Sequence, residues 1–344
     1  MVVAARRTPI ATTGGRLSLV TAERLAAHVV GACVEDATRA TDAELIIGDV
    51  VLGNCMGPGG NTARLAVLAA GLETTVPGMT IDRQCGSGLA SIVASAQAIR
   101  AGDERMQIAG GVESASTAPA RSVDGVAYAR APFAPDGFPD PEMGPAAQAL
   151  AALHSVGRGY QDDYAARSHR LALDAQLAGR FNEELVAVDG VRADDGPRAG
   201  MPAMLGRFPL LFPGIGGDSP GTVTAGNSCR ISDGAAAVAL VPNARRGSAP
   251  GLAIVATATI GCDPALPGIG PVAAVNQALA EAGISLDDVA AFEIVEAFAA
   301  QTLAVLLELG LVRDGVVDSR VCSDGGALAL GHPWGASGAV SVVR

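Results

Sequence analysis

The stretch MTIDRQCGSGLASIVASAQAIRAG, residues 79–102, decides the fold, because a short strand pattern runs through a glycine-rich turn into a helix of small residues. Cys85 ends the strand, and Gly86 and Gly88 permit a sharp turn and a close approach of other atoms. A thiol at a helix N-terminus lies near unpaired N–H groups and the positive end of the helix dipole, which stabilise a thiolate. The stretch therefore predicts a nucleophilic cysteine, and the alternative is a buried structural cysteine beside a helix cap.

The order of strands and helices around this stretch is repeated from residue 251 onward. Strands that alternate with helices of this length favour right-handed crossovers and mostly parallel sheets covered on both faces, which is an α/β fold class. In the first half the pattern predicts strands at residues 2–10, 49–54, 79–88, 106–114 and 234–242, and helices at 19–37, 61–72 and 89–102. In the second half it predicts strands at residues 252–264 and 292–297, and helices at 271–283 and from 335 onward.

A stretch rich in Pro, Gly, Asp and Arg, residues 119–224, separates the two halves. It has one clear helical pattern, at residues 161–177, and its composition indicates a lid or an inserted loop domain rather than more sheet. We therefore divide the chain into an N-terminal half (1–118 and 225–248), a loop domain (119–224) and a C-terminal half (249–344).

The C-terminal half has no counterpart of the strands at residues 106–114 and 234–242. Either the chain is incomplete at its C-terminal end, or the protein leaves one sheet unfinished. A missing strand would expose a sheet edge and an apolar helix face, which favours an incomplete chain.

The composition excludes several classes of function. The formal net charge of -11 opposes binding to nucleic acid or to an anionic membrane, since both favour basic surfaces. All 24 positively charged residues are Arg, so Schiff-base chemistry on Lys and a phosphate-binding P-loop Lys are excluded. Guanidinium or backbone N–H groups would have to bind any phosphate.

The cellular location and the state of the cysteines follow from simple patterns. No apolar run reaches the about 18 to 20 residues that span a bilayer, and residues 1–7 lack the apolar core of a secretory signal. A cytoplasmic protein is therefore expected. The six cysteines form neither a CxxC pair nor a cluster with zinc-ligand spacing, so we interpret them as reduced thiols and expect no metal site.

His332 stands in the second half where Cys85 stands in the first, at a strand-to-helix turn within GGALALGHPWGASG, residues 325–338. Equivalent turns of a pseudo-symmetric fold converge at its middle. A neutral imidazole there can take a proton from a thiol and act as a general base. The alternative is a capping or core histidine. The other three histidines lie in helical segments and are interpreted as structural.

Seven motifs, in this order and at these spacings, resemble the thiolase family, which includes acetyl-CoA acetyltransferases and 3-ketoacyl-CoA thiolases. One motif would be weak support, but seven in register leave little room for chance. The resemblance implies duplicated βαβαβαββ halves stacked as α-β-α-β-α layers with an inserted loop domain. The amino-acid sequences of three motifs are more similar to those of degradative thiolases of fatty acid β-oxidation than to those of biosynthetic thiolases. The motifs are RQCGSGLAS (83–91), GGVESAS (110–116), RGYQDDYAARSH (158–169), GTVTAGNSCRISDGAAA (221–237), GIGP (268–271), EAFAAQ (296–301) and GGALALGHPWGASGA (325–339).

The resemblance also implies roles for individual residues. Cys85 matches the nucleophile that accepts the acyl group, its N–H would help to form an oxyanion hole, and His332 matches the base. Coenzyme A is implied as substrate and product, with no permanently bound cofactor and no metal. A homodimer or homotetramer is expected, with the loop at residues 53–64 either a contact region or an ordinary surface turn. The residues implied to line the substrate pocket are Met143, Cys229, Ile231, Ala297 and Phe298.

Three departures from the family pattern bear on activity. Val295 replaces an Asn or His that holds the water of a second oxyanion hole, and losing one oxyanion donor reduces rates by about 100- to 1,000-fold. Cys229 stands where a Ser usually contacts the pantetheine amide, and a thiol hydrogen-bonds poorly. The C-terminal Cys-x-Gly segment, which supplies a second catalytic thiol in the family, is absent from the chain.

These observations favour an acyltransferase of thiolase type that works through an acyl-Cys85 intermediate. One alternative is a thiolase-like variant whose condensation activity is altered or lost because of Val295. Another is a coenzyme A-binding protein that keeps the fold without turnover.

Overall fold

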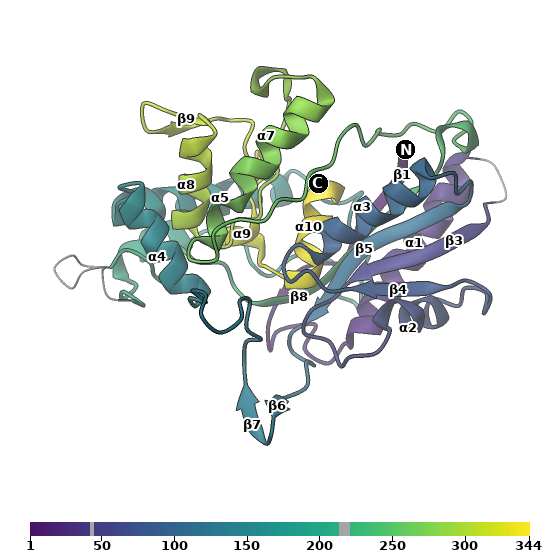
Figure 1. Cartoon of the computed structure of the whole chain (residues 1–344), viewed down its shortest axis with the longest axis horizontal. Helices are drawn as coiled ribbons and strands as arrows, with labels where there is room; N and C mark the ends of the chain where they lie inside the picture. Colours follow the sequence, from purple (N-terminus) through teal and green to yellow (C-terminus); the bar gives the residue numbers. More distant parts are fainter. Residues whose placement is uncertain (42–44, 213–220) are drawn as a thin grey trace.

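A mixed sheet forms the frame of the N-terminal half in the computed structural model, which describes residues 1–41, 45–212 and 221–344 (Figure 1). Over these residues the sheet has six strands, and each neighbouring pair is joined by hydrogen bonds. The strand order is β1 (Val2–Arg7), β8 (Ser232–Leu240), β5 (Met106–Ser114), β3 (Ile47–Gly53) and β4 (Gly78–Ile81), with β2 (Ala11–Thr12) paired to β8.

The prediction of a mostly parallel sheet was wrong for one side of this sheet. Strand β3 is parallel to both β4 and β5, as the crossover pattern predicts. Strand β8 is antiparallel to β5, β1 and β2. The chain reaches β8 from the loop domain rather than through a single crossover helix, so the right-handed parallel rule does not govern its direction. Every residue of β5 and β8 is buried.

Helices cover both faces of the sheet, and the last helix of the chain lies on the N-terminal half. Helices α1 (Ala22–Thr41) and α2 (Thr62–Ala69) pack on one face. Helices α3 (Ser87–Arg100) and α10 (Trp334–Val343) lie side by side on the other face (Figure 1). A Cβ atom on Gly88 would lie 2.8 Å from the carbonyl oxygen of Gly335, so glycine at position 88 allows these helices to touch.

The C-terminal half contains helices and extended chain in place of the predicted second sheet. The strand predictions for residues 252–264 and 292–297 were wrong, since within the described ranges these segments make only isolated bridges, such as Val2 with Leu252 and Phe292 with Val321. Extended backbone becomes a strand only when a neighbour pairs its N–H and C=O groups. The elements here are α7 (Gly270–Ala282), α8 (Ala299–Glu308), α9 (Ala327–Leu330) and the hairpin β9 (Val312–Arg313) and β10 (Val316–Val317).

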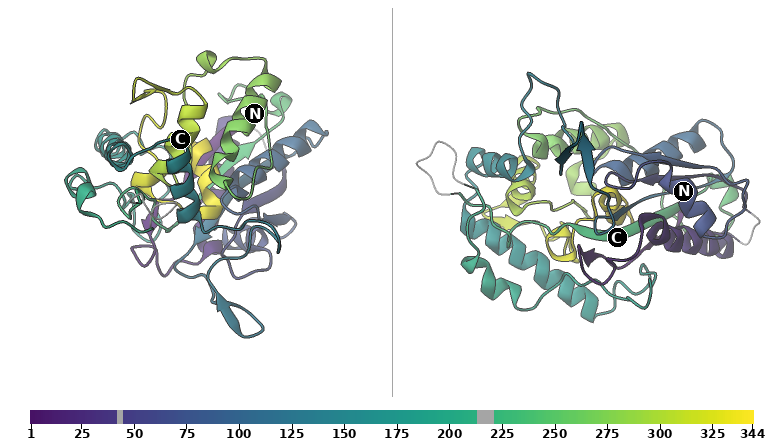
Figure 2. Two further views of the ribbon diagram at one scale, coloured as in Figure 1. Left: turned by 60° about the vertical axis from the view of Figure 1, so that its left-hand side comes forward. Right: turned by 90° about the horizontal axis from the view of Figure 1, so that it is seen from below.

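The loop domain supplies helices and a hairpin. The predicted helix is confirmed as α5 (Arg158–Leu177), which begins three residues earlier than expected. Helix α4 (Met143–Leu153), the short α6 (Met201–Met204) and the hairpin of β6 (Arg121–Val123) and β7 (Val126–Tyr128) were not predicted. Figures 1 and 2 show this hairpin projecting away from the body of the molecule. Four short 3-10 helices complete the described elements: Leu205–Arg207, Asn243–Arg245, Pro267–Ile269 and Leu286–Asp288.

Two features attach the loop domain to the halves. A buried ion pair joins Arg7 at the end of β1 to Asp194, with Arg7 Nη1 2.7 Å from Asp194 Oδ1 and both side chains fully buried. Helices α4, α5 and α8 share a second hydrophobic core that includes Leu303 and Leu306. Among the described residues, no helix is both long and apolar enough to cross a membrane.

Candidate active site

Cys85 lies in a tight turn between β4 and α3. Gln84, the residue before it, has a φ of 49°, a left-handed conformation that is uncommon for a residue with a side chain. The Ser87 hydroxyl stabilises the turn, since it accepts a hydrogen bond from Arg83 N at 2.7 Å and donates one to Gln84 O at 2.6 Å. Gly86 is the N-cap of α3, so Cys85 stands just outside the helix. The turn therefore presents an exposed thiol from a strained backbone.

The surroundings of Cys85 favour the neutral thiol. Although Cys85 is exposed as a residue, the protein around its sulfur desolvates the thiol and raises its pKa to about 12, and the negative charges of Glu113 and Asp82 add to the rise. The N–H of Cys85 itself acts in the opposite direction. Our expectation of a thiolate stabilised by the helix end was therefore wrong, because desolvation and two nearby carboxylates oppose it. A base must remove the proton before this thiol can attack.

His332 lies in a buried turn between α9 and α10. Its Nδ1 is 2.6 Å from Ser337 Oγ, and its backbone N–H donates to Arg230 O at 2.9 Å. The Arg230 side chain donates to Ala329 O at 2.5 Å and so holds the same turn a second time. Burial lowers the pKa of His332 to about 4, which keeps the imidazole neutral at physiological pH. In the part of the chain that the structure describes, no hydrogen bond engages Nε2. In the tautomer whose Nδ1–H donates to Ser337 Oγ, Nε2 is the unprotonated nitrogen and can accept a proton.

The segment at residues 228–232 brings most of the predicted site residues together. Cys229 N donates to Ala297 O at 2.9 Å, and Ser228 forms an antiparallel bridge with Phe298. On its other side, Ile231 forms a parallel bridge with His332. Burial raises the pKa of the Cys229 thiol to about 12, and the neighbouring Cys85 contributes to the rise. The structure thus places Cys229, Ile231, Ala297, Phe298 and His332 on three adjoining segments, with the Cys85 sulfur close to Cys229.

Met143 is placed less directly. It is the first residue of α4 and is half-buried. Helix α4 packs against α8, whose N-cap is Phe298. The structure therefore brings the helix that carries Met143 next to the site.

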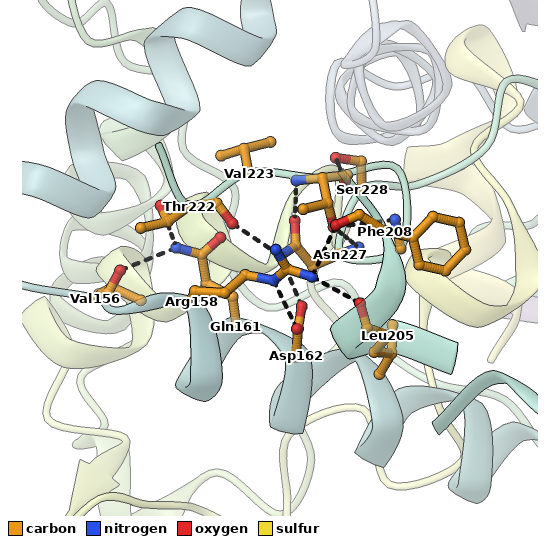
Figure 3. A network of polar contacts seen from close by, with 12 residues as sticks. Val156, Arg158, Gln161, Asp162, Leu205, Phe208, Thr222, Val223, Asn227 and Ser228 are labelled. Atoms are coloured by element: carbon orange, nitrogen blue, oxygen red, sulfur yellow. Dashed lines mark hydrogen bonds and ion pairs between the residues drawn. The ribbon is translucent and has the colours of Figure 1, made fainter. Parts of the chain in front are cut away.

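A polar network joins α5 to residues 222–227, the segment that precedes Cys229 (Figure 3). Asp162 accepts hydrogen bonds from Arg158 Nε at 2.6 Å and from Asn227 Nδ2 at 2.9 Å. Asn227 Oδ1 accepts from Thr224 N at 2.8 Å, and its backbone oxygen accepts from Ala299 N at 2.9 Å. The network therefore fixes the loop domain, the 222–229 segment and the start of α8 relative to one another.

Two buried carboxylates near the site were not identified from the sequence. Glu296 accepts hydrogen bonds from Tyr164 Oη at 2.8 Å, Ser168 Oγ at 2.7 Å and Leu328 N at 3.2 Å, which joins α5 to the helix before His332. Glu113, at the end of β5, carries a negative charge that helps to raise the pKa of the Cys85 thiol. A carboxylate inside an apolar motif such as GGVES is a signal that could have identified it, since an unpaired charge is seldom buried.

Val295 lies beside the His332 turn. It is half-buried and lines a small, mainly apolar cavity together with Leu330, Pro333 and Ser337. Its side chain offers no hydrogen-bond donor to this cavity. Among the described residues, no group of three or more His, Cys, Asp and Glu side chains is arranged to hold a metal ion.

Comparison with known families gives two matches that cover nearly the whole chain. Residues 1–244 match the N-terminal domain of thiolases, and residues 249–344 match their C-terminal domain. The chain belongs to the thiolase family. The family assignment and the α/β fold class predicted from the sequence are thereby confirmed.

Individual members of the thiolase family agree with this assignment. The crystal structure of a Bacillus anthracis acetyl-CoA acetyltransferase has a TM-score of 0.88 and 34% identity, and the match covers 99% of this chain and 90% of that one. A protein of Bacillus subtilis (strain 168), provisionally named acetyl-CoA C-acetyltransferase YhfS, is 40% identical over 349 residues, which is 100% of this chain and 90% of the relative. The similarly named VraB of Staphylococcus aureus (strain COL) is 38% identical over 361 residues, with 100% and 91% covered.

Proposed function

We propose that this chain is a thiolase-type acyltransferase that takes an acyl group from acyl-coenzyme A onto Cys85 and passes it to coenzyme A or to a second acetyl-coenzyme A. One observation carries the proposal. Helix α3 begins two residues after Cys85 and α10 begins two residues after His332, and the first turns of these helices touch at Gly88 and Gly335. An exposed thiol and a buried neutral imidazole thus stand at two adjoining helix ends.

The protonation states support a concerted role for the two residues. The Cys85 thiol holds its proton, and His332 is neutral, so His332 Nε2 takes the proton as the sulfur attacks the thioester carbonyl. The bond between the carbonyl carbon and the coenzyme A sulfur breaks, and the leaving thiolate recovers the proton from His332. The Cys85 N–H lowers the pKa of its own thiol and is a candidate oxyanion donor.

The pocket residues support a thioester with a pantetheine arm as the substrate. Phe298 and Ile231 are apolar residues on segments that adjoin His332, and apolar side chains beside an acyl-enzyme would exclude water from it. Two relatives carry the name acetyl-CoA C-acetyltransferase, which favours acetyl-coenzyme A as the acyl donor. The degradative direction, the cytoplasmic location and a homodimer or homotetramer, all predicted from the sequence, belong to the same proposal.

The proposal is tested by incubating the chain with acetyl-coenzyme A and measuring the intact mass and the modified peptide. A gain of one acetyl group on Cys85, reversed by added coenzyme A, is the expected result. The Cys262→Ala variant is a matched control, since Cys262 is also an exposed free cysteine. Binding of coenzyme A without any adduct on Cys85 would instead identify a coenzyme A-binding protein without turnover.

A second candidate function follows from Val295. A thiolase-like enzyme that forms the acyl-Cys85 intermediate but condenses poorly fits a valine that lines the cavity beside Pro333 and Ser337. The Val295→Asn variant should then increase the thiolysis of 3-ketoacyl-coenzyme A. An unchanged rate in this variant would count against the idea.

A further inference from the structure

Glu113, at the carboxyl end of β5, is a buried charged residue that the proposed acyl transfer does not use. Only 1% of it is exposed, and it lies in a strand of buried, mainly small and apolar residues. Burying a carboxylate is strongly unfavourable unless hydrogen bonds compensate for the lost water. The hydrogen-bond partners of Glu113 therefore indicate its role in the structure.

Five hydrogen-bond donors converge on this carboxylate. Glu113 Oε1 accepts from Asn54 Nδ2 at 2.9 Å and from Met56 N at 3.1 Å. Glu113 Oε2 accepts from Cys55 N at 3.3 Å, Cys55 Sγ at 2.8 Å and Gly335 N at 3.0 Å. The first four donors follow β3 in the N-terminal half, and the fifth belongs to α10 in the C-terminal half. Glu113 thus joins the two halves through one side chain.

The donor pattern requires both the charge and the length of a glutamate. Both oxygens accept only, so a deprotonated carboxylate satisfies all the donors, whereas a glutamine would turn its NH2 group toward one set of N–H groups. An aspartate keeps the charge but is one methylene shorter, so it cannot reach both sets. A glutamine at position 113 therefore removes the charge but keeps the length of the side chain, whereas an aspartate keeps the charge but shortens the side chain.

The donors at residues 54–56 and the donor at Gly335 belong to the segments that support the Cys85 turn and the His332 turn, respectively. On one side, a Cβ atom on Gly53 would lie 2.4 Å from the carbonyl carbon of Ser87, so the end of β3 packs on the first turn of α3, directly after Cys85. On the other side, Gly335 N lies in the first turn of α10, where a backbone N–H has no partner within the helix, and the N-cap Pro333 makes no side-chain capping bond. Glu113 supplies that cap from β5.

We propose that Glu113 is a positioning residue that holds the Cys85 turn and the His332 turn in register across the boundary between the two halves. It caps α10, which follows His332, and it fixes the end of β3, which supports the start of α3. The inference rests on the proposed acyl transfer, because only a shared proton makes the relative placement of the two turns matter. A displacement of about 1 Å between reacting groups can reduce a rate by about 100-fold.

Glu113 also contributes to the charge around Cys85. Besides His332, the proposed base, the ionisable groups near this thiol are Glu113 from β5, Asp82 just after β4, and the thiols of Cys55 and Cys229. Removal of the Glu113 charge should lower the pKa of Cys85 and make the thiol more reactive toward a small electrophile. Misplacement of the turns should slow acyl transfer. The charge and the position of Glu113 therefore affect two measurable rates in opposite directions.

The experiment compares the wild type with Glu113→Gln, Glu113→Asp and the control Leu25→Ala. Leu25 is fully buried in α1, on the opposite face of the sheet, so its variant reports a loss of stability alone. For each protein we would measure the alkylation rate of Cys85 by iodoacetamide between pH 6.5 and 9.5, kcat and KM for acyl transfer from acetyl-coenzyme A, and the thermal midpoint.

The expected results separate position from charge. Glu113→Gln should alkylate faster than the wild type at every pH, while its kcat falls about 10- to 100-fold and its KM changes little. Glu113→Asp should lose kcat similarly with an unchanged alkylation rate. The inference would be overturned if both Glu113 variants kept the wild-type kcat. It would also be overturned if their loss of kcat were no larger than that of Leu25→Ala. If the wild type forms no acetyl-Cys85, the proposed function fails. In that case, faster alkylation in Glu113→Gln alone would still support the effect of the Glu113 charge on Cys85. An unchanged alkylation rate in Glu113→Gln would refute that effect.

Discussion

The turn that carries Cys85 and the turn that carries His332 are built from similar glycine-rich sequence, and yet the fold holds them differently. Cys85 is exposed after a residue with a left-handed φ, and its turn is stabilised by local hydrogen bonds from Ser87. His332 is 4% exposed, and bonds from distant segments, through Arg230 and Glu113, hold its turn. The proposed nucleophile thus remains accessible, while the proposed base is fixed within the protein.

This difference separates two requirements of acyl transfer. A nucleophile must be reached by a large thioester, so its turn is open and supported locally. A base must keep one protonation state and one orientation, and burial with multiple hydrogen bonds supplies both. The glycines at positions 88 and 335 allow the two turns to meet despite these opposite environments.

The largest expected effect comes from removing the base. His332→Gln should reduce the rate of acetyl-Cys85 formation by about 100- to 10,000-fold, the usual contribution of a general base. Rapid quenching followed by mass spectrometry of the Cys85 peptide measures this rate. His154→Gln is the matched control, because His154 caps the C-terminal end of α4 and should leave the rate unchanged. Equal rates for both variants would remove His332 from the mechanism.

A smaller effect is expected where the two turns touch. Gly88→Ala would place a methyl group 2.8 Å from Gly335 O, and overpacking of this kind lowers the free energy of unfolding by about 1–3 kcal/mol. It should also slow acylation, since the two helix ends must move apart. Urea unfolding of this variant is best compared with that of Gly31→Ala.

The Gly31 control should move in the opposite direction. Gly31 lies within α1, and a Cβ atom there meets nothing within 4 Å. Alanine at this position should raise the free energy of unfolding by about 0.5–1 kcal/mol, because glycine is a poor helix former. A similar response at both positions would mean that the contact between the turns is not tight.

Much of the N-terminal half could be predicted from the sequence because its signals are local. Strand β5 has the predicted bounds, since a mainly apolar segment is flanked by polar and turn-forming residues. The strands predicted at residues 252–264 and 292–297 failed because their apolar pattern needs neighbouring strands to become sheet. A sequence pattern indicates which segments can pair, whereas the formation of a sheet depends on the partners that tertiary structure provides.

The sequence predicted which residues form the candidate site, and their roles stay predictions, but it did not predict the electrostatics. The glycine-rich turns identified Cys85 and His332, and the bridges around Ile231 place the other pocket residues nearby. The neutral thiol was missed because its main causes, desolvation by the surrounding protein and the charge of Glu113 on β5, arise from tertiary structure. Likewise, the cap that Glu113 provides to α10 joins residues far apart in the chain, which local patterns do not reveal.

The pH profile of Cys85 acylation tests the central claim, that the thiol gives its proton to a buried neutral imidazole. Because burial lowers the pKa of His332 to about 4, His332 remains a base above that pH. The rate should stay level as the pH falls through 6.5 and should drop only near pH 4, as His332 becomes protonated. The same limb should be absent in His332→Gln. A limb near pH 6.5, or one near pH 4 that persists in His332→Gln, would contradict the account.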